Sequence, residues 1–224
     1  MNKTYVEINN LTKFIKGREI LSDINLNLDK GKIYGFMGKN GSGKTMLFRS
    51  ICGLIKASKG EVIINEKILG RDISFPESVG VLIEYPGFLP NLTGFENLKY
   101  LADIKSEIGK AEIETVLENV GLDKNDSRKF KRYSLGMKQR LGIAQAIMEN
   151  PELIILDEPT NALDTDGIAL INNIIMDLKK QNKIILIASH DKEELELIAD
   201  EIYKIDGGKI LGHVVLKEKV SNEK

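Results

Sequence analysis

The sequence predicts an α/β protein with a mainly parallel sheet, an antiparallel β region at the amino end and a helical subdomain inserted in the middle. Three observations lead to this prediction. Residues alternate between polar and apolar near the start, apolar strand-like runs later alternate with helix-like segments, and strand-like runs stop over residues 88–150. Strands that alternate with helices favour a parallel sheet covered on both faces.

The first part of the chain is expected to form strands. Residues 5–8 alternate, and residues 24–28 (Ile-Asn-Leu-Asn-Leu) alternate strictly, which is typical of a strand with one covered face. Residues 33–37 (Ile-Tyr-Gly-Phe-Met) are apolar on both faces, which indicates a buried parallel strand. A helix is predicted from Lys44 to about Gly53, followed by a short strand over Glu61–Ile64.

The helical insertion and the elements after it follow from the spacing of apolar residues. Three segments of the insertion show helical spacing: Thr93–Ala102, Lys110–Val120 and Gly136–Met148. The later predicted elements are strands at Leu153–Leu156 and Ile184–Ala188, a helix near Asp166–Lys180 and a hairpin turn at Asp206-Gly207-Gly208. We therefore predict a single domain, 1–224, with a core of 1–87 and 151–216, a helical subdomain of 88–150 and a charged tail, 217–224, that frays.

Composition limits the function classes. The formal net charge of the 224 residues is -1, so no overall field favours nucleic acid or anionic lipid. The single cysteine, Cys52, rules out an internal disulfide and fits a reducing, cytosolic compartment. The start lacks a signal peptide, and the apolar runs are far below the roughly 20 residues needed to span a bilayer. We expect a chain that does not cross a membrane by itself but could sit against a protein that does.

A glycine-rich loop lies between the predicted strand at 33–37 and the helix from Lys44. Residues 38–45 read Gly-Lys-Asn-Gly-Ser-Gly-Lys-Thr, the pattern of a P-loop NTPase core. Its glycines let backbone N–H groups turn toward phosphate oxygens, and the helix adds its positive end. Lys44 is expected to reach the β- and γ-phosphates and the Thr45 hydroxyl to bind Mg²⁺. The expected nucleotide-binding residues here are Gly38, Asn40, Gly41, Ser42, Gly43, Lys44, Thr45 and Met46. A chance glycine-rich turn is the less favoured alternative.

Two carboxylates, Asp157 and Glu158, directly follow the predicted strand Leu153–Leu156. Such a position places both at the carboxyl edge of a parallel sheet, beside the phosphate loop. We expect Asp157 to hold Mg²⁺, directly or through its waters, and Glu158 to accept a proton from the attacking water. Alone, a solvated acidic turn would be the better interpretation, and the loop upstream reverses that preference.

His190 follows the predicted strand Ile184–Ala188, so it should lie in a loop at the same sheet edge. Asp191 and Glu194 resemble a capping box that opens a helix after it. A single histidine is usually structural or exposed, but this placement favours a contact with a γ-phosphate.

Ser134 and Gly136 stand at the start of another predicted helix. Small residues at such a helix end leave backbone N–H groups open, which suits a second phosphate contact. By composition alone this is an ordinary helix start.

Taken together, these motifs resemble the ABC ATPase family over nearly the whole chain. The matching motifs, in chain order, are Walker A at Gly38–Thr45, the signature at Ser134 and Gly136, Walker B at Leu153–Asp157 with Glu158 as catalytic base, the D-loop at Asn161–Asp164, and the H-loop at His190. The resemblance implies the ABC ATPase fold and adds Asp164 to the expected nucleotide-binding residues.

The segment 80–93 resembles the subgroup that serves bacitracin and lantibiotic resistance exporters. In that subgroup a glutamate commonly replaces the glutamine of the Q-loop, and Glu84 stands at that place. The resemblance implies that Glu84 is a catalytic-site residue and a metal ligand. An exposed glutamate at a strand end is the alternative.

The sequence departs from the family pattern at two places. Leu135 replaces a signature glycine and Met137 replaces the signature glutamine, so phosphate contact there rests mainly on Ser134 and Gly136. The base-stacking aromatic of the family would fall at Ile15, with Phe14 beside it. Phe14 can stack on adenine or belong to the core, and both alternatives stay open.

The resemblance implies ATP and Mg²⁺ as ligands, a head-to-tail dimer with a second ATPase subunit, and integral-membrane permease partners. The favoured hypothesis is the ATPase subunit of an exporter of lantibiotic- or bacitracin-like peptides, placed on the cytoplasmic face of the membrane through a permease, with no nucleic acid involved. An ABC-type ATPase that acts on ribosomes or nucleic acid is the alternative. A GTPase or small-molecule kinase is remote, because the sequence has no Asn-Lys-x-Asp motif.

Overall fold

The computed structural model describes residues 4–84 and 87–216 of the chain. The predicted tail at 217–224, and residues 85–86 of the segment after Glu84, lie outside the described residues. The strands are β1 (Thr4–Ile15), β2 (Arg18–Asp29), β3 (Ile33–Met37), β4 (Lys59–Ile64), β5 (Lys67–Ile68), β6 (Val79–Leu82), β7 (Leu153–Asp157), β8 (Ile184–Ser189), β9 (Glu201–Asp206) and β10 (Lys209–Val215). The helices are α1 (Lys44–Ile51), α2 (Gly94–Lys105), α3 (Lys110–Asn119), the 3-10 helix η1 (Phe130–Arg132), α4 (Leu135–Ile147), α5 (Thr165–Lys180) and α6 (Lys192–Ile198).

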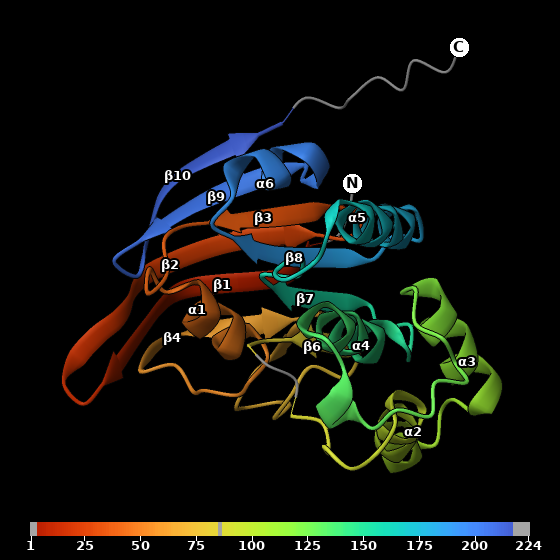
Figure 1. Cartoon of the computed structure of the whole chain (residues 1–224). Helices are drawn as coiled ribbons and strands as arrows, with labels where there is room; N and C mark the ends of the chain where they lie inside the picture. Colours follow the sequence, from red (N-terminus) through yellow and green to blue (C-terminus); the bar gives the residue numbers. More distant parts are fainter. Residues whose placement is uncertain (1–3, 85–86, 217–224) are drawn as a thin grey trace.

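These strands form two sheets (Figure 1). The first is antiparallel in the pairings of β1 with β2 and β4 and of β4 with β5, and has the order β2-β1-β4-β5. The second has the order β10-β9-β3-β8-β7-β6 and is parallel except for the hairpin strand β10. The predicted fold class, an antiparallel amino-terminal region followed by a mainly parallel sheet, is confirmed.

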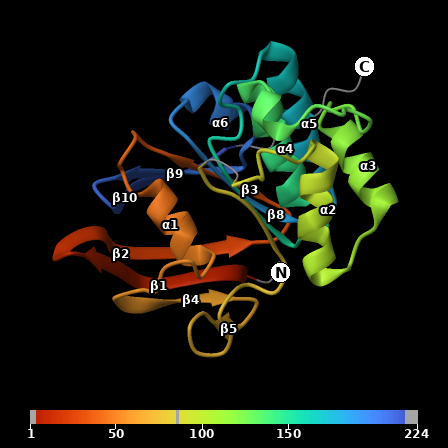
Figure 2. The same cartoon turned by 60° about the horizontal axis from the view of Figure 1, so that its bottom comes forward.

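The six-stranded sheet separates two apolar cores. On one face it packs with α1 against the antiparallel sheet, and Figure 2 shows α1 between the two sheets. On the other face it packs against helices α2 to α6. Successive residues of β7 point to opposite cores: Leu153 and Ile155 to the first, Ile154 and Leu156 to the second. Both faces are therefore buried, which explains the unbroken apolar runs of the sequence.

The predicted helices of the insertion form with capped ends. Thr93 and Glu96 make a reciprocal capping box at the start of α2, with Thr93 Oγ1 3.1 Å from the Glu96 nitrogen. Helix α4 packs both on α3 and on strands β6 and β7 of the sheet. The division of the chain into a core and a helical subdomain stays a prediction. Among the described residues, no helix has the length and apolar character needed to cross a bilayer.

One local feature, the cap of α6, differs from the sequence expectation. Asp191 does cap α6, because its Oδ1 accepts from the nitrogens of Glu193 and Glu194. However, the Glu194 carboxylate does not return to the cap. It accepts hydrogen bonds from the hydroxyls of Ser189 and Thr160 instead, so the expected capping box is only half formed. Tertiary partners compete successfully here with the local partner.

The hairpin turn between β9 and β10 forms where it was predicted. Gly207 and Gly208 have φ of 52° and 74°, the left-handed pair that a two-residue hairpin needs. Adding a Cβ at Gly208 would bring it within 2.1 Å of the Ile20 carbonyl oxygen, so the turn also requires glycine for close packing on β2.

The parallel strands bring the predicted site residues to one edge of the sheet. Strands β3, β8, β7 and β6 all end at the carboxyl edge of the sheet. The phosphate loop, 38–45, follows β3, and His190 follows β8. Asp157 closes β7 and is followed by Glu158, and Glu84 lies just after β6. Ligands of open parallel sheets bind beyond this edge.

Candidate functional site

The loop between β3 and α1 is shaped by glycines. Gly41 and Gly43 have φ of 80° and 112°, which side-chain-bearing residues rarely adopt. At Gly38 a Cβ would lie 2.4 Å from the Ile205 carbonyl oxygen. Gly43 is the N-cap of α1 and no side chain caps that helix, so the first N–H groups of α1 have no side-chain acceptor at the cap. The result is an open, positively polarised helix end.

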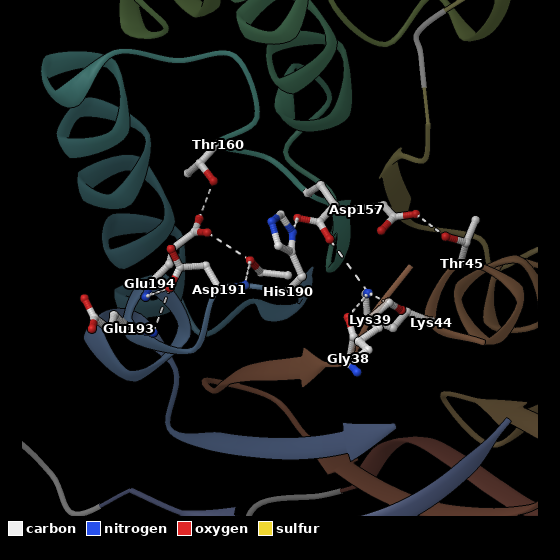
Figure 3. Close-up of polar contacts among 12 residues, drawn as sticks. Gly38, Lys39, Lys44, Thr45, Asp157, Thr160, His190, Asp191, Glu193 and Glu194 are labelled. Carbon is white, nitrogen blue, oxygen red and sulfur yellow. Dashed lines mark hydrogen bonds and ion pairs between the residues drawn. The ribbon is translucent and has the colours of Figure 1, made fainter. Parts of the chain in front are cut away.

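Lys44 is buried and its ammonium group lies under this loop. It donates hydrogen bonds to the carbonyl oxygens of Gly38 and Lys39, the latter at 3.3 Å. It also lies 3.7 Å from Glu158 Oε1, with the Lys44 side chain only 5% exposed (Figure 3). A nearly buried cation beside an open helix end makes this the most electropositive part of the loop.

Asp157 and Thr45 meet across the gap between β7 and α1. The Thr45 hydroxyl donates to Asp157 Oδ2 at 2.6 Å (Figure 3). Burial raises the pKa of Asp157, and the negative charges of Glu158 and Glu84 raise it further, whereas Thr45 and Lys44 lower it. The negative charge of ionised Asp157 is thus only partly compensated by its neighbours, and a cation beside it would stabilise the ionised form.

Glu158 links the acidic pair to the next loop. Its Oε2 lies 2.9 Å from Nδ1 of His190, whose side chain is 59% exposed. Its Oε1 is buried and has no hydrogen-bond partner, as is also true of Ser42 Oγ in the phosphate loop. Buried polar atoms are normally paired, so these two oxygens mark positions that a polar ligand or water can fill.

These groups surround a cavity of about 540 Å³. That volume lies within the roughly 300–1,000 Å³ of small-molecule sites. Its lining residues are Ile15, Ile20, Lys39, Asn40, Gly41, Ser42, Gly43, Lys44, Thr45, Met46, Glu84, Leu135, Lys138, Gln139, Asp157, Glu158, Asn161 and Ala162. The structure therefore brings most of the predicted loop residues, the acidic pair and Glu84 to one cavity.

Glu84 contacts the cavity from the end of β6, but its carboxylate has a partner that the sequence did not suggest. Glu84 Oε1 lies 3.0 Å from Nη2 of Arg49 on α1. The Glu84 side chain is 59% exposed, and its φ of 58° is left-handed. Within residues 4–84 and 87–216, no group of three or more acidic, histidine or cysteine side chains is arranged to hold a metal ion by itself.

The remaining predicted residues form a separate surface patch. Ser134 Oγ caps α4 by accepting from the Met137 nitrogen, and Asp164 caps α5 by accepting from the Gly167 nitrogen. The hollow between these helix ends is lined by Ser134, Leu135, Gly136, Met137, Arg140, Ala162, Leu163 and Asp164. Ser134, Gly136 and Asp164 do not line the larger cavity. Gly38 and His190 line neither the cavity nor this hollow and instead face a third hollow beside Lys39 and Asn40. Within one chain, the predicted site residues thus fall into three groups, and His190 is joined to the cavity through its contact with Glu158.

Neither alternative for Phe14 is supported by its position. Phe14 is 40% exposed near the tip of the β1–β2 hairpin, so it is no core residue, and it does not line the cavity. Its ring lies 6.0 Å from the Lys59 ammonium. Ile15 and Ile20 line the cavity at this side instead, so the wall nearest the hairpin is aliphatic.

Sequence reasoning missed several residues that hold the site together. Gln139 Nε2 donates to the carbonyl oxygens of Glu158 and Pro159 at 3.0 Å each, and fixes the acidic loop against α4. Glu194 accepts a hydrogen bond from Thr160 in the loop after β7 (Figure 3). It also accepts one from Ser189 at the end of β8, and so joins the two segments. The four-residue spacing of Thr45 and Arg49 puts both on one face of α1, but it does not indicate Glu84 as the partner of Arg49.

Comparisons with known proteins agree with this geometry. The family model described as ABC transporter matches residues 21–161. An uncharacterized ABC transporter ATP-binding protein, YybJ of Bacillus subtilis (strain 168), is 44% identical over 92% of this chain and 94% of its own length. The bacitracin transport ATP-binding protein BcrA of Enterococcus faecalis is 43% identical over 95% and 70%, respectively. The lantibiotic transport ATP-binding protein SrtF of Streptococcus pyogenes is 39% identical over 92% and 89%.

The solved dimeric structure of MJ0796, a bacterial ABC transporter cassette, matches with a TM-score of 0.86 over 95% of this chain and 99% of that one, at 24% identity. This likeness supports the fold. The family match covers more than half of the chain and includes both the phosphate loop and the acidic pair, and the three relatives, at 39–44% identity, are each named as an ABC transporter or transport ATP-binding protein. The chain therefore belongs to the ABC transporter family, in which it is an ATP-binding and ATP-hydrolysing subunit.

Proposed function

We propose that this chain powers a membrane exporter of antimicrobial peptides of the bacitracin or lantibiotic kind. The observation that carries the ATPase part is the convergence of Lys44, Thr45, Asp157 and Glu158 on one cavity. The exporter part is supported by the names of two relatives, a bacitracin and a lantibiotic transport ATP-binding protein.

In this proposal the phosphate loop holds the β- and γ-phosphates of ATP. Lys44 exchanges its hydrogen bonds to the Gly38 and Lys39 carbonyls for phosphate oxygens, and the N–H groups at the start of α1 donate to the same anion. The unpaired Ser42 hydroxyl lies in the same loop and supplies a further donor. None of these groups needs to travel far, because all already line the cavity.

Thr45 and Asp157 would hold Mg²⁺. Their oxygens already converge, and the Asp157 carboxylate is buried with a raised pKa, so the pair fits a hard cation with oxygen ligands. The ion would neutralise charge on the phosphates. The chain's own contribution is to keep both ligands on rigid elements, the first turn of α1 and the end of β7.

Glu158 and His190 carry the hydrolytic step. Glu158 accepts the proton of the attacking water through Oε1, which accepts no hydrogen bond and lies 3.7 Å from the Lys44 ammonium. His190 holds the other oxygen, Oε2, and can present its second ring nitrogen to the γ-phosphate.

The complete site requires a second subunit in this proposal. Ser134, Gly136 and Asp164 form a patch apart from the cavity, so they are free to cap the nucleotide of a partner in a head-to-tail dimer. The matching solved structure of MJ0796 is described as dimeric. Closure of two chains around ATP would complete the ring of donors only when nucleotide is present.

The other partners are integral-membrane permease subunits, which would hold the chain at the cytoplasmic face of the membrane. The support for such partners is the match of the chain to the family described as ABC transporter. With a net charge of -1, no nucleic-acid partner is proposed.

The test expresses the chain with the membrane-protein genes adjacent to its own in a peptide-sensitive bacterium. We expect the chain to co-purify with a membrane protein and to raise the inhibitory concentration of bacitracin or a lantibiotic several-fold. The Glu158→Gln chain should co-purify equally but give no protection. Protection by both chains, or neither co-purification nor protection, would refute the proposed export function.

A further inference from the structure

Arg49 and Glu84 form an ion pair at the rim of the nucleotide cavity. Arg49 Nη2 lies 3.0 Å from Glu84 Oε1, and the two side chains are 34% and 59% exposed. Arg49 lies in the last turn of α1, and Glu84 follows the end of β6. The pair therefore joins the helix that opens the phosphate loop to the strand at the edge of the parallel sheet.

The same face of α1 meets two neighbouring carboxylates. Thr45 and Arg49 are four residues apart, so they lie one above the other on the helix. Thr45 bonds Asp157 at the end of β7, and Arg49 pairs with Glu84 beyond the end of β6. Strands β6 and β7 are adjacent and parallel, with Leu82 opposite Leu156. The two carboxylates thus leave the sheet side by side and face one helix.

The Glu84 carboxylate is paired from outside the cavity lining. Three carboxylates line the cavity, those of Glu84, Asp157 and Glu158, beside the lysines Lys39, Lys44 and Lys138. Among the ion pairs of the described residues, Lys44 lies 3.7 Å from Glu158, whereas Glu84 is paired with Arg49. Glu84 already contributes to the unfavourable charge around Asp157. A glutamate at this place adds a negative charge that an amide would not, and Arg49 is the cation that offsets it.

We propose that Arg49 is a positioning residue that holds the Glu84 carboxylate at the cavity rim and so sets how strongly bound nucleotide is coupled to its divalent cation. This inference rests on the proposed Mg²⁺–ATP site. In the pair described, Glu84 is neutralised by Arg49. When a cation enters beside Asp157, Glu84 has a second positive partner, and Arg49 competes with that ion for the carboxylate.

The Arg49–Glu84 ion pair is weak enough for Glu84 to exchange Arg49 for another cation. An ion pair in which one partner is more than half exposed changes an equilibrium by roughly fivefold or less. Loss of Arg49 would leave Glu84 unpaired, which weakens binding of metal-free nucleotide by repulsion and strengthens binding of the metal complex. Both effects raise the ratio of the two dissociation constants.

The experiment measures the dissociation constant of a fluorescent ATP analogue for the full chain, once in Mg²⁺ and once in EDTA. The four proteins compared are wild type, Arg49→Gln, Glu84→Gln and the double variant. We expect Arg49→Gln to raise the EDTA-to-Mg²⁺ ratio by about three- to fivefold in the wild-type background. In the Glu84→Gln background the same substitution should leave the ratio unchanged within about twofold.

Two further variants act as controls. Arg49→Lys keeps the charge and should keep the ratio close to wild type, which a loss of fold would not do. Arg71→Gln removes an arginine from the exposed Arg71–Asp72 pair outside the cavity, and it should leave the ratio unchanged.

The outcomes separate this inference from the proposed function. Equal effects of Arg49→Gln with and without Glu84, or no effect in either background, would overturn the positioning role while wild type still binds nucleotide in a Mg²⁺-dependent way. If wild-type affinity does not depend on Mg²⁺, or if Lys44→Ala binds as tightly as wild type, the proposed nucleotide site itself fails.

Discussion

At the scale of single residues, the backbone of Glu158 determines what its carboxylate can reach. Its φ of 51° is left-handed, a conformation that costs a side-chain-bearing residue about 1 kcal/mol or more. The hydrogen bond from its nitrogen to the Ala188 carbonyl at 2.9 Å holds this conformation against β8. The side chain then lies between Lys44 and His190. A strained residue held between two basic groups is consistent with the role of general base proposed for it.

Replacing Glu158 by glutamine tests that role. The amide has almost the same shape but cannot take a proton from water, so we expect turnover to fall by about 100-fold or more while ATP binding is retained. Removing the negative charge beside the phosphates should also favour an ATP-dependent dimer, which size-exclusion chromatography would detect. Glu77→Gln, on an exposed pair with Lys67, is the matched control. Undiminished turnover would remove Glu158 from the mechanism.

The sequence predicted Lys44, Thr45, Asp157 and Glu158 because each stands at a fixed offset from a glycine or from a buried strand. The contact of Arg49 with Glu84 could not be predicted in the same way. In the sequence, Arg49 is a basic residue in the last turn of a helix, where its positive charge interacts favourably with the negative end of the helix dipole. Its partner depends on where the loop after β6 returns, which no local pattern specifies.

At the scale of elements, the site depends on how closely β6 packs on α4. A Cβ at Gly80 of β6 would lie 1.6 Å from the Ala146 carbonyl oxygen of α4, so the strand and the helix touch through backbone. The long helices and the strands β3, β4, β7 and β8 were predicted within a few residues, since their apolar patterns persist over their length. The predictions at 5–8 and 24–28 covered only part of β1 and β2, and no strand was predicted at β6 or β9. Strand β5 spans only two residues, Lys67–Ile68, and leaves no such signal.

Substitution of Gly80 tests the importance of this contact. Because the clashing atom is a main-chain oxygen, the strand must shift, and we expect Gly80→Ala to lower the free energy of unfolding by about 2–4 kcal/mol. Gly212→Ala in β10 is the control, since a Cβ there meets nothing within 4 Å, and its effect should stay within about 0.5 kcal/mol. Denaturant unfolding measures both. Similar stabilities of the two variants would show that β6 and α4 separate at little cost.

At the scale of the whole molecule, the two edges of the parallel sheet differ in the groups that they carry. The carboxyl edge bears the nucleotide cavity. The opposite edge carries an ionic cluster in which Glu152 accepts from Lys30 and, at 3.0 Å, from the nearly buried Lys183. The Lys30 ammonium also lies 4.7 Å from the ring centre of Tyr5 in the antiparallel sheet. The cluster therefore ties the two sheets together at the amino edge of the parallel sheet.

This cluster could not be found in the sequence, although it organises the fold. Glu152 and Lys30 are 122 positions apart, and neither belongs to a motif. Each resembles an ordinary charged residue next to a strand. Their proximity follows only from the order of strands in the sheet, which puts β8 between β3, the strand after Lys30, and β7, the strand after Glu152.

The pH dependence of stability tests the cluster. Hydrogen bonding from Lys30 and then from Lys183 outweighs burial and holds the pKa of Glu152 below its ordinary value of 4.5. A carboxylate with a lowered folded pKa stabilises the fold fully above its unfolded pKa, and this contribution is lost as pH falls through the folded pKa. At pH 7, Glu152→Gln should cost about 1–2 kcal/mol, less than for a fully buried pair because Glu152 remains about a third exposed.

Below the ordinary pKa of glutamate, the unfolding free energies of wild type and Glu152→Gln should converge. At pH 3.5 part of the wild-type contribution is lost, whereas the glutamine variant has no carboxyl at this position to titrate, so the difference in unfolding free energy between them should shrink. Denaturant unfolding at both pH values measures it, with Glu77→Gln as a control whose exposed pair should give little difference at either. A difference that is the same at pH 7 and pH 3.5 would mean that Glu152 acts through packing, and that charge does not hold the two sheets together at this edge.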